Sequence, residues 1–445
     1  MTCQISLLSD MAKSREATPP ARRHNSPEEG MRLCYFIAFT FIIFAFPQQI
    51  TYLIIIMKEK ILKLNDIKST NLQAVLDVLL QTDGLSRVEI ARRIGCDNTT
   101  VTRAVGALIE QGIVVQGEKT EQALGRPRVI LRINPDGPLL LGLSLEAERI
   151  TGVLTDLRGI PQEHCQIDFK GLPSKTDFLD AVADVIHHLK EMANDRLRGI
   201  GAAVFGIYSG DDFKLENAAA LPALNGTELR PFFEKAADSH VTICDHLVAK
   251  MSFFSRKLPQ LNSGTVMLVS AGNGIGSLMA EDGRLVFSRN NHGGELGHTI
   301  CQPDGMPCSC GRRGCLETVA SIPALLRRCR DKLAMPQLDF EKVRQLYGEG
   351  DQTVRHEVAT VVDFLGIAIA NLLNNNPVQQ LVVTGGILRL GQDFQSSLEA
   401  KINSILFASV KSDMTTHFLL PEQEDSLACG AAIFAEKKNK LIVNC

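Results

Sequence analysis

The feature that most constrains this chain is a short loop, rich in glycine and proline, that carries one histidine and three cysteines. The loop begins at His298 and places thiols at Cys308, Cys310 and Cys315. One imidazole and three thiolates suit Zn²⁺, which prefers four nitrogen and sulfur ligands in a tetrahedron. The intervening glycines let the backbone turn the sulfur atoms inward. We therefore expect this loop to hold a zinc ion.

Two other interpretations of the loop are weighed against zinc. The loop could be a mobile segment with free cysteines, which its spacing and composition disfavour. It could also hold a disulfide. However, the twelve cysteines of the 445-residue chain follow no regular framework, which indicates a reducing compartment. We therefore expect a cytoplasmic protein.

Carboxylates flank the loop on both sides. Glu295 lies in the run Gly293-Gly294-Glu295-Leu296-Gly297 before His298, and Glu317 follows shortly after the last cysteine. The whole run resembles the signature of the ROK family, which contains repressors, open reading frames and sugar kinases. In that family the corresponding Glu, His and second Glu contact a sugar. The resemblance therefore implies sugar-binding roles for Glu295, His298 and Glu317. A zinc ion on one ring nitrogen of His298 would orient the other.

The first 56 residues differ in composition from the rest. Residues 33–56 are apolar and about long enough to span a bilayer, with arginines before them. They could form a membrane anchor, although Pro47 and two glutamines interrupt the run. We favour another interpretation, in which an ordinary protein starts at Met57 and residues 1–56 are a mis-assigned extension.

Residues 57–133 are predicted to form a winged helix-turn-helix domain. Apolar residues at helical spacing in residues 72–79 predict the first helix. The run Ser86–Glu89 has the pattern of a capping box that starts a second helix. A third helix is expected from Thr99 to Gln111, capped by the residues just before it, and two strands that frame a wing follow it.

The side chains expected to contact DNA lie on the third helix and in the wing. On the helix they are polar residues near its N-terminus: Asn98, Thr99, Thr100, Thr102 and Arg103. In the wing they are Arg126 and Arg128, which could enter a minor groove or clamp a phosphate. A solvated helical face would explain the first group equally well, but the basic wing favours DNA. The arrangement resembles the N-terminal domain of ROK repressors, which the kinases of that family lack.

Residues 134–445 are predicted to form two lobes. The first lobe comprises residues 134–255, completed by residues 425–445, and the second comprises residues 256–424. Three strands, a helix and a fourth strand open the first lobe, as in ribonuclease H-like, actin-like lobes. The fold class is therefore α/β, with an N-terminal winged helix-turn-helix followed by a two-lobed actin-like domain that carries the zinc loop.

The first turn of this domain departs from the kinases of the family. Where they carry Asp-x-Gly-Gly-Thr, this chain has Ser144-Leu145-Glu146-Ala147-Glu148. A phosphate loop needs glycines so that backbone N–H groups can approach the anion. A carboxylate at 4 Å from a phosphate charge instead costs about 1 kcal/mol even in water. We therefore expect ATP binding to be lost and the protein not to be an enzyme.

The sugar side of the domain is better preserved. Asp245 follows a strand and matches the general base of the family's kinases, which here would only accept hydrogen bonds. Gly206 and Asn225 occupy positions where substrate-side loops of the family are expected. Cys244 and Leu247 replace asparagines that usually flank the aspartate, and this leaves the identity of the sugar open.

These patterns favour a transcriptional repressor of genes for sugar uptake or catabolism. A sugar or sugar phosphate would bind between the lobes and change the spacing of paired winged-helix domains. An operator with two half-sites needs two copies of the chain, so we expect a homodimer or homotetramer. One alternative is a sugar kinase with an accessory DNA-binding domain. Another is a regulator controlled by a partner protein, such as a transporter subunit.

Overall fold

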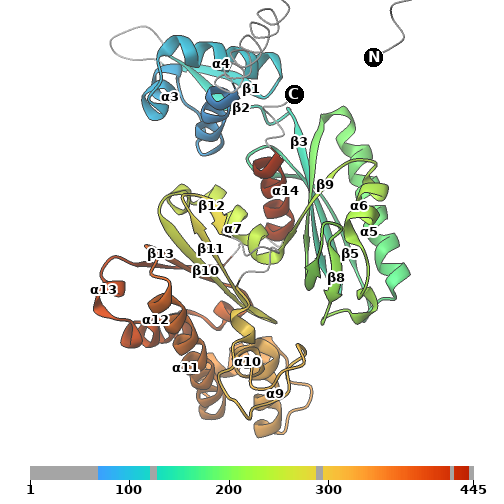
Figure 1. Cartoon of the computed structure of the whole chain (residues 1–445), viewed down its shortest axis with the longest axis vertical. Coiled ribbons are helices and arrows are strands. Elements are labelled where there is room, and N and C mark those ends of the chain that lie inside the picture. The colour runs from blue at the N-terminus through green and yellow to red at the C-terminus, as the bar shows by residue number, and fades with distance from the viewer. Residues whose placement is uncertain (1–68, 121–127, 287–293, 421–424, 440–445) are drawn as a thin grey trace, which may run out of the picture. The chain divides into compact units, whose positions relative to one another are not determined.

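The structure is a computed structural model, and it describes residues 69–120, 128–286, 294–420 and 425–439 (Figure 1). The expectations for residues 1–56 and for Arg126 lie outside these residues. The domain boundaries given above remain predictions.

The described part of residues 57–133 has the predicted winged helix-turn-helix. Its elements are a helix over residues 69–80, α3 (Arg87–Ile94), α4 (Asn98–Glu110), β1 (Val114–Thr120) and β2 (Arg128–Ile133). The two strands pair antiparallel. The helices close around side chains with no exposed surface, which include Leu76, Leu79, Ile90, Val101 and Leu108. Their helical spacing is the periodicity that predicted these helices.

Side-chain caps fix where the two short helices begin. Ser86 and Glu89 form the predicted capping box, in which Ser86 N donates to Glu89 Oε2 at 2.8 Å and Glu89 N donates to Ser86 Oγ at 3.4 Å. Asp97 starts α4 by accepting bonds from Thr99 N and Thr100 N, at 2.8 and 2.9 Å. These bonds pair N–H groups that have no partner within the helix.

The first lobe is built on a five-stranded sheet in the order β5-β4-β3-β6-β9. The strands are β3 (Leu139–Glu146), β4 (Arg149–Thr155), β5 (Pro161–Asp168), β6 (Leu197–Val204) and β9 (Val241–Asp245). β3, β4 and β5 pair antiparallel, whereas β3, β6 and β9 are parallel. β3 is apolar along almost its whole length because both of its faces are covered.

Helices cover both faces of the first sheet (Figure 1). The helices are α5 (Lys175–Ala193) and α6 (Leu229–Ala237) on one face, and α7 (His246–Lys257) and α14 (Ser426–Asn439) on the other. α14 lies so close to the sheet that a Cβ atom on Gly142 would stand 1.9 Å from the Ala428 carbonyl oxygen. Only glycine permits this approach. A small hairpin, β7 (Ile207–Ser209) and β8 (Lys214–Asn217), follows β6.

The second lobe has a five-stranded sheet in the order β12-β11-β10-β13-β14. The strands are β10 (Thr265–Ala271), β11 (Ile275–Glu281), β12 (Arg284–Val286), β13 (Gln380–Thr384) and β14 (Thr415–Leu419). Its helices are α8 (Glu317–Ala320), α9 (Ile322–Leu333), α10 (Phe340–Glu349), α11 (Gln352–Asn375), α12 (Gln392–Ile405) and α13 (Ala408–Lys411). The described part of the chain thus has the predicted α/β, two-lobed, actin-like arrangement.

One helix of the second lobe passes a test for membrane spans. α11 is long and apolar enough to cross a bilayer, and among the described residues it alone meets that criterion. Half of its most apolar window is buried inside the protein, however. Its side chains Val361, Leu365 and Ile369 belong to the core of the second lobe. We therefore interpret α11 as a core helix.

The winged helix-turn-helix contacts the first lobe through both apolar and polar groups. Leu140, Leu157 and Ala432 of the lobe belong to the same buried cluster as the core of the winged domain. Next to them, Arg158 Nη1 lies 3.0 Å from Asp83 Oδ1. A shared core of this kind couples the orientation of the two regions more firmly than an ion pair alone.

Candidate effector cleft and metal centre

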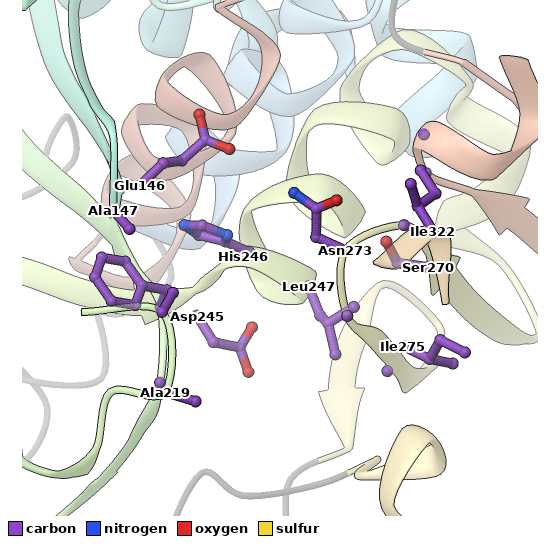
Figure 2. A pocket seen from close by; sticks show the side chains of 18 of the residues that line it. Glu146, Ala147, Ala219, Asp245, His246, Leu247, Ser270, Asn273, Ile275 and Ile322 are labelled. Carbon is purple, nitrogen blue, oxygen red and sulfur yellow. The ribbon is translucent and has the colours of Figure 1, made fainter. Parts of the chain in front are cut away.

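A cavity of about 1170 Å³ lies between the sheets of the two lobes, and we call it the cleft. Figure 2 shows Glu146, His246 and Asp245 on one side of it and Ser270, Asn273 and Ile275 on the other. Five of the residues predicted to bind the effector line this cleft: Gly206, Asp245, Glu295, His298 and Glu317. Their chain positions are far apart, so it is the fold that brings them together.

Asp245 stands where parallel strand β9 ends and α7 begins. Its Oδ1 accepts a hydrogen bond from Val248 N at 2.7 Å, which makes Asp245 the N-cap of α7. The carboxyl ends of parallel strands are where ligands bind in open α/β sheets. The cap therefore holds the carboxylate at the wall of the cleft.

Gly206 and Asn225 have different environments. Gly206 lines the cleft with φ +93°, and a Cβ atom there would lie 2.7 Å from the Asn217 carbonyl oxygen, so the turn requires glycine. Asn225 is not among the described residues that line the cleft. Its Oδ1 accepts a hydrogen bond from Ala218 N at 2.7 Å. This bond ties Asn225 to its own loop, and its contact with an effector stays a prediction.

Glu317 begins α8 and faces the glycine turn between β10 and β11. Its Oε2 accepts a hydrogen bond from Ile275 N at 3.1 Å. One backbone amide of the Gly272–Gly276 turn is thus already occupied by a carboxylate. The sequence did not indicate this contact, because 42 residues separate the two partners.

The carboxylates of the first turn lie on the cleft, as expected. Glu146 ends β3 opposite Arg149 of β4, and both Glu146 and Glu148 line the cavity. Burial raises the pKa of Glu146, while the charges of Arg149 and Lys250 oppose that rise. The kinases of the family carry glycines at this turn. Here an approaching phosphate would meet carboxyl groups instead.

Three further cleft residues escaped the sequence analysis. His246 and Lys250 lie one helical turn apart on α7, and Arg389 follows the Gly385-Gly386 turn. The signal that could have found the first two is their spacing of four residues on the helix that starts at Asp245. Residues at that spacing share one face of a helix.

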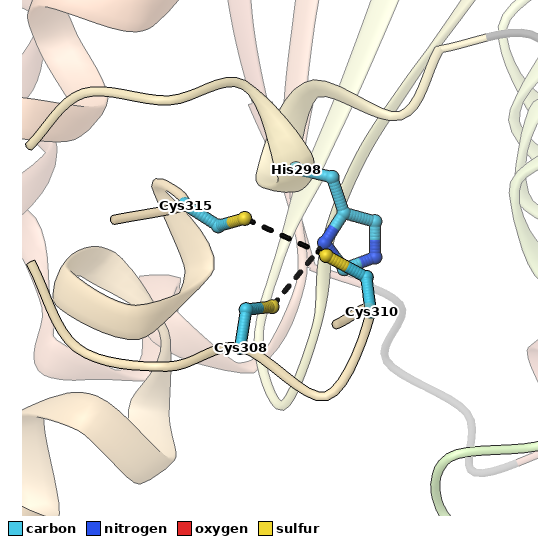
Figure 3. A group of neighbouring side chains, drawn as sticks. All are labelled: His298, Cys308, Cys310 and Cys315. Atoms are coloured by element: carbon cyan, nitrogen blue, oxygen red, sulfur yellow. Dashed lines mark hydrogen bonds between the residues drawn. The ribbon is translucent and has the colours of Figure 1, made fainter. Parts of the chain in front are cut away.

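The metal ligands predicted from the sequence converge in space. Figure 3 shows His298, Cys308, Cys310 and Cys315 around one point, and their ligand atoms all lie within 4.8 Å of one another. Cys310 Sγ lies 3.6 Å from Cys315 Sγ, and Cys308 Sγ lies 3.5 Å from His298 Nδ1. A tetrahedral ion with the usual zinc bond lengths would give edges of about 3.5–3.8 Å. The cluster therefore fits a metal ion of that size.

Backbone turns fold the loop around this cluster. Gly314 has φ +71°, and a Cβ atom there would lie 1.5 Å from the Gln302 carbonyl oxygen, so no other residue fits. Cys308 N donates to Arg312 O at 2.7 Å and closes a tight turn over Cys310. Burial alone would raise the pKa of Cys310, but hydrogen bonds from Arg312 and the neighbouring thiols lower it to about 6. The loop thus favours a thiolate at one of its ligand positions.

His298 connects the metal cluster with the cleft. Its Nδ1 faces Cys308, whereas its Nε2 lies 3.8 Å from Glu295 Oε2. The imidazole can therefore bind a metal through one nitrogen while the other faces the effector side. Such an arrangement fixes both the tautomer and the ring orientation.

The predicted DNA-contacting residues are placed on the surface of α4 and at the start of β2. Asn98, Thr99, Thr102 and Arg103 are exposed, whereas Thr100 is partly buried and donates its hydroxyl to Asp97. Arg128 Nη1 lies 4.0 Å from Glu89 Oε1, which ties the base of the wing to α3. The helix thus presents a short polar face with one guanidinium.

Two family profiles match this chain. The ROK family profile matches residues 141–438, and a winged helix-turn-helix DNA-binding profile matches residues 69–115. The chain is 25% identical over 350 residues to the xylose repressor of Bacillus spizizenii, which covers 77% of this chain and 88% of that protein. It is 23% identical over 372 residues to the DNA-binding transcriptional dual regulator NagC of Escherichia coli, with 78% and 88% covered.

A solved structure has the same fold over most of the chain. It is a ROK family transcriptional regulator described as a homolog of the Escherichia coli MLC protein. The two structures superpose with a TM-score of 0.70 at 21% identity, over 85% of this chain and all of the other. At this level of identity the likeness establishes the fold.

Proposed function

The chain belongs to the ROK family, and from this premise we propose that it is a DNA-binding transcriptional repressor that responds to a sugar or sugar phosphate. One observation carries the proposal: a winged helix-turn-helix shares a core with a lobe whose cleft holds Asp245, Glu295, His298 and Glu317. Three carboxylates offer acceptors for the hydroxyls of a polyol, and the oriented imidazole offers its Nε2–H as a donor. Relatives named xylose repressor and N-acetylglucosamine repressor support this assignment.

The metal in the loop is proposed to be zinc. Three thiols and one imidazole are the donor set that zinc prefers, and the Cys308–His298 and Cys310–Cys315 separations of 3.5 and 3.6 Å suit a tetrahedron of its size. When bound, the ion would hold the loop together and orient His298 toward the cleft. Its role is then structural, because four protein ligands leave no open position for a substrate.

We propose that the cleft no longer binds ATP. Glu146 and Glu148 stand at the first turn, and Glu317 occupies the Ile275 amide in the second glycine turn. A nucleotide phosphate would meet carboxylates where it needs N–H donors. We therefore do not assign an enzymatic activity. A sugar kinase with a DNA-binding domain remains the outcome that Mg²⁺-dependent phosphorylation of a sugar would establish.

A packed route connects the cleft to the DNA-binding domain. α7 begins at Asp245 in the cleft, and Arg256 lies near its other end. Arg256 donates to the Leu157 carbonyl at 2.7 Å and to Glu436 of α14 at 2.8 Å. Because Leu157 belongs to the core of the winged domain, a shift of α7 would reach that domain directly. This route supports a coupling between effector and operator binding.

The need to bind two operator half-sites sets the expected oligomeric state. We propose a cytoplasmic homodimer or homotetramer, because paired half-sites require paired recognition helices. A transporter subunit is retained as an alternative signal, since Cys244 and Leu247 stand where the family carries sugar-reading asparagines.

DNA selection tests this function directly. The full chain is used to select duplexes from a random-sequence pool, and affinity for the selected duplex is then measured for Arg103→Ala. If Arg103 reads a base, discrimination should fall by about 1–3 kcal/mol at one position. Arg284→Ala, which removes an exposed arginine of β12, serves as the matched control and should keep wild-type affinity. A failure to select any duplex, or equal loss in both variants, would contradict the assignment.

A further inference from the structure

One cation on the wall of the cleft has no part in the function proposed above. Lys250 lies one turn after His246 on α7, and both side chains line the cavity. Its ammonium donates a hydrogen bond to Ser270 Oγ at 2.7 Å, at the end of β10. The lysine therefore reaches from the first-lobe side of the cleft to the wall of the second lobe.

The ammonium of Lys250 is only partly satisfied by the protein. It has three N–H donors, and within the described residues the Ser270 hydroxyl is its one hydrogen-bond partner. No carboxylate oxygen of these residues lies within 4.0 Å of it. Burial lowers the pKa of Lys250, against the opposing effect of Glu146 and Asp245 at longer range. A desolvated cation with spare donors is a natural receptor for an anion.

Two glycine turns lie next to Ser270. β10 and β13 pair with Ser270 opposite Thr384, so that the Gly272–Gly276 turn and Gly385 lie just beyond Ser270. A Cβ atom on Gly385 would stand 2.2 Å from the Ala271 carbonyl oxygen, which shows how closely the two turns pack. The Glu317 carboxylate already accepts the Ile275 N–H of the first turn. The Lys250 ammonium, and not these turns, is therefore the donor for an anion.

The other charged residues of the cleft are mostly acidic, and its two arginines are paired with carboxylates. Arg149 Nε lies 2.6 Å from Asp168 Oδ1, and Arg389 Nη2 lies 2.6 Å from Glu341 Oε1. Glu146, Glu148 and Asp168 line the first-lobe side, and Glu295 and Glu317 line the opposite side. An anionic group placed among them would be repelled. The position beside Lys250 is therefore where a negative charge on an effector is best accommodated.

We propose that the effector is an acidic sugar and that Lys250 is the residue that selects it. The carboxylate or phosphate of the sugar would take the free donors of Lys250, while its hydroxyls face Asp245, His298 and Glu317. This inference rests on the proposed function and deepens it. Phosphate and carboxylate share the required chemistry, and the arms of the test separate them.

Calorimetry with the full chain tests the proposal. The probes are glucose, glucose 6-phosphate and glucuronate, together with N-acetylglucosamine and its 6-phosphate, and xylose and xylonate. At least one acidic probe should bind about tenfold more tightly than its neutral parent. Lys250→Met should remove this preference by weakening the binding of the acidic probe, whereas Lys250→Arg should retain the preference. Preference for the 6-phosphates or for the sugar acids identifies the anionic group.

The outcomes separate this inference from the function it rests on. If neutral and acidic probes bind equally to the wild type, Lys250 does not select an anion and the inference is wrong. It is equally wrong if Lys250→Met weakens both classes alike, because the lysine would then only bridge the lobes through Ser270. Lys250→Gln repeats the test should the methionine variant unfold. If every sugar fails to bind, the proposed function itself is wrong.

Discussion

His246 is a partly buried imidazole at the edge of the cleft, and its partner fixes its tautomer. Its Nε2 lies 2.9 Å from the Leu145 carbonyl oxygen. A carbonyl can only accept a hydrogen bond, so Nε2 carries the proton and Nδ1 has a free lone pair. Burial, with the charge of Lys250, lowers the pKa of His246 to about 4. The ring is therefore neutral near pH 7.

This lowered pKa predicts a pH dependence of stability. In the unfolded chain the imidazole binds a proton near its ordinary pKa of 6.5, whereas the folded chain binds it only near 4. Because the unfolded state then holds more protons, the free energy of unfolding should fall as pH drops between these values, by up to about 1.4 kcal/mol per pH unit. Urea titrations should show a flatter slope for His246→Gln. The exposed His187→Gln should behave as the wild type, and an unchanged slope in His246→Gln would contradict the assignment.

At the scale of elements, α7 and α14 hold the two lobes and the winged domain together. A buried ion pair joins them, because Arg256 and Glu436 lie 2.8 Å apart with side chains that are 5% and 2% exposed. Removing one member of such a pair leaves an uncompensated charge in the interior.

Glu436→Gln should therefore destabilise the protein by about 3–5 kcal/mol, measured by urea unfolding. Asp363→Asn provides the control, because Asp363 pairs with Lys401 at 2.7 Å on the surface. An exposed pair of this kind contributes at most about 1 kcal/mol. Equal effects of the two substitutions would show that the α7–α14 contact does not stabilise the fold in the way described.

Most elements were predictable from the sequence, because local rules place them. The capping box at Ser86, the apolar run of β3 and the helical spacing in α4 all appear where those rules put them. The positions of Asn225 and Lys250 were not predictable. Their roles depend on contacts with Ala218 and Ser270, which are set by how a loop closes and how two lobes meet. No local periodicity reports such contacts.

For the whole molecule, the metal loop connects the wall of the cleft to the core of the second lobe. His298 faces both the cysteine cluster and Glu295, and Cys315 is fully buried next to the core residue Leu316. Loss of the metal should therefore affect the cleft as well as the loop. Binding of structural zinc also contributes to folding free energy.

The purified chain should contain about one zinc ion per molecule by elemental analysis. Cys308→Ser should lose the metal and lower the thermal midpoint, because a hydroxyl does not replace a thiolate ligand. Cys301→Ser changes a neighbouring cysteine that lies outside the cluster, and it should retain zinc. A well-folded wild-type preparation without zinc would exclude the proposed metal.

The central claim is that a sugar in the cleft controls binding of DNA by the winged domain. The most direct measurement is the affinity for a selected operator duplex, by fluorescence anisotropy, with and without each sugar probe. At least one probe should weaken operator binding by the wild type, and the same concentration should have a much smaller effect on Glu317→Gln. Glu317→Gln keeps an acceptor for Ile275 N and removes only the charge, so its affinity without sugar should match that of the wild type. If no probe changes the operator affinity of the wild type, or if Glu317→Gln responds at wild-type concentrations, the account is contradicted.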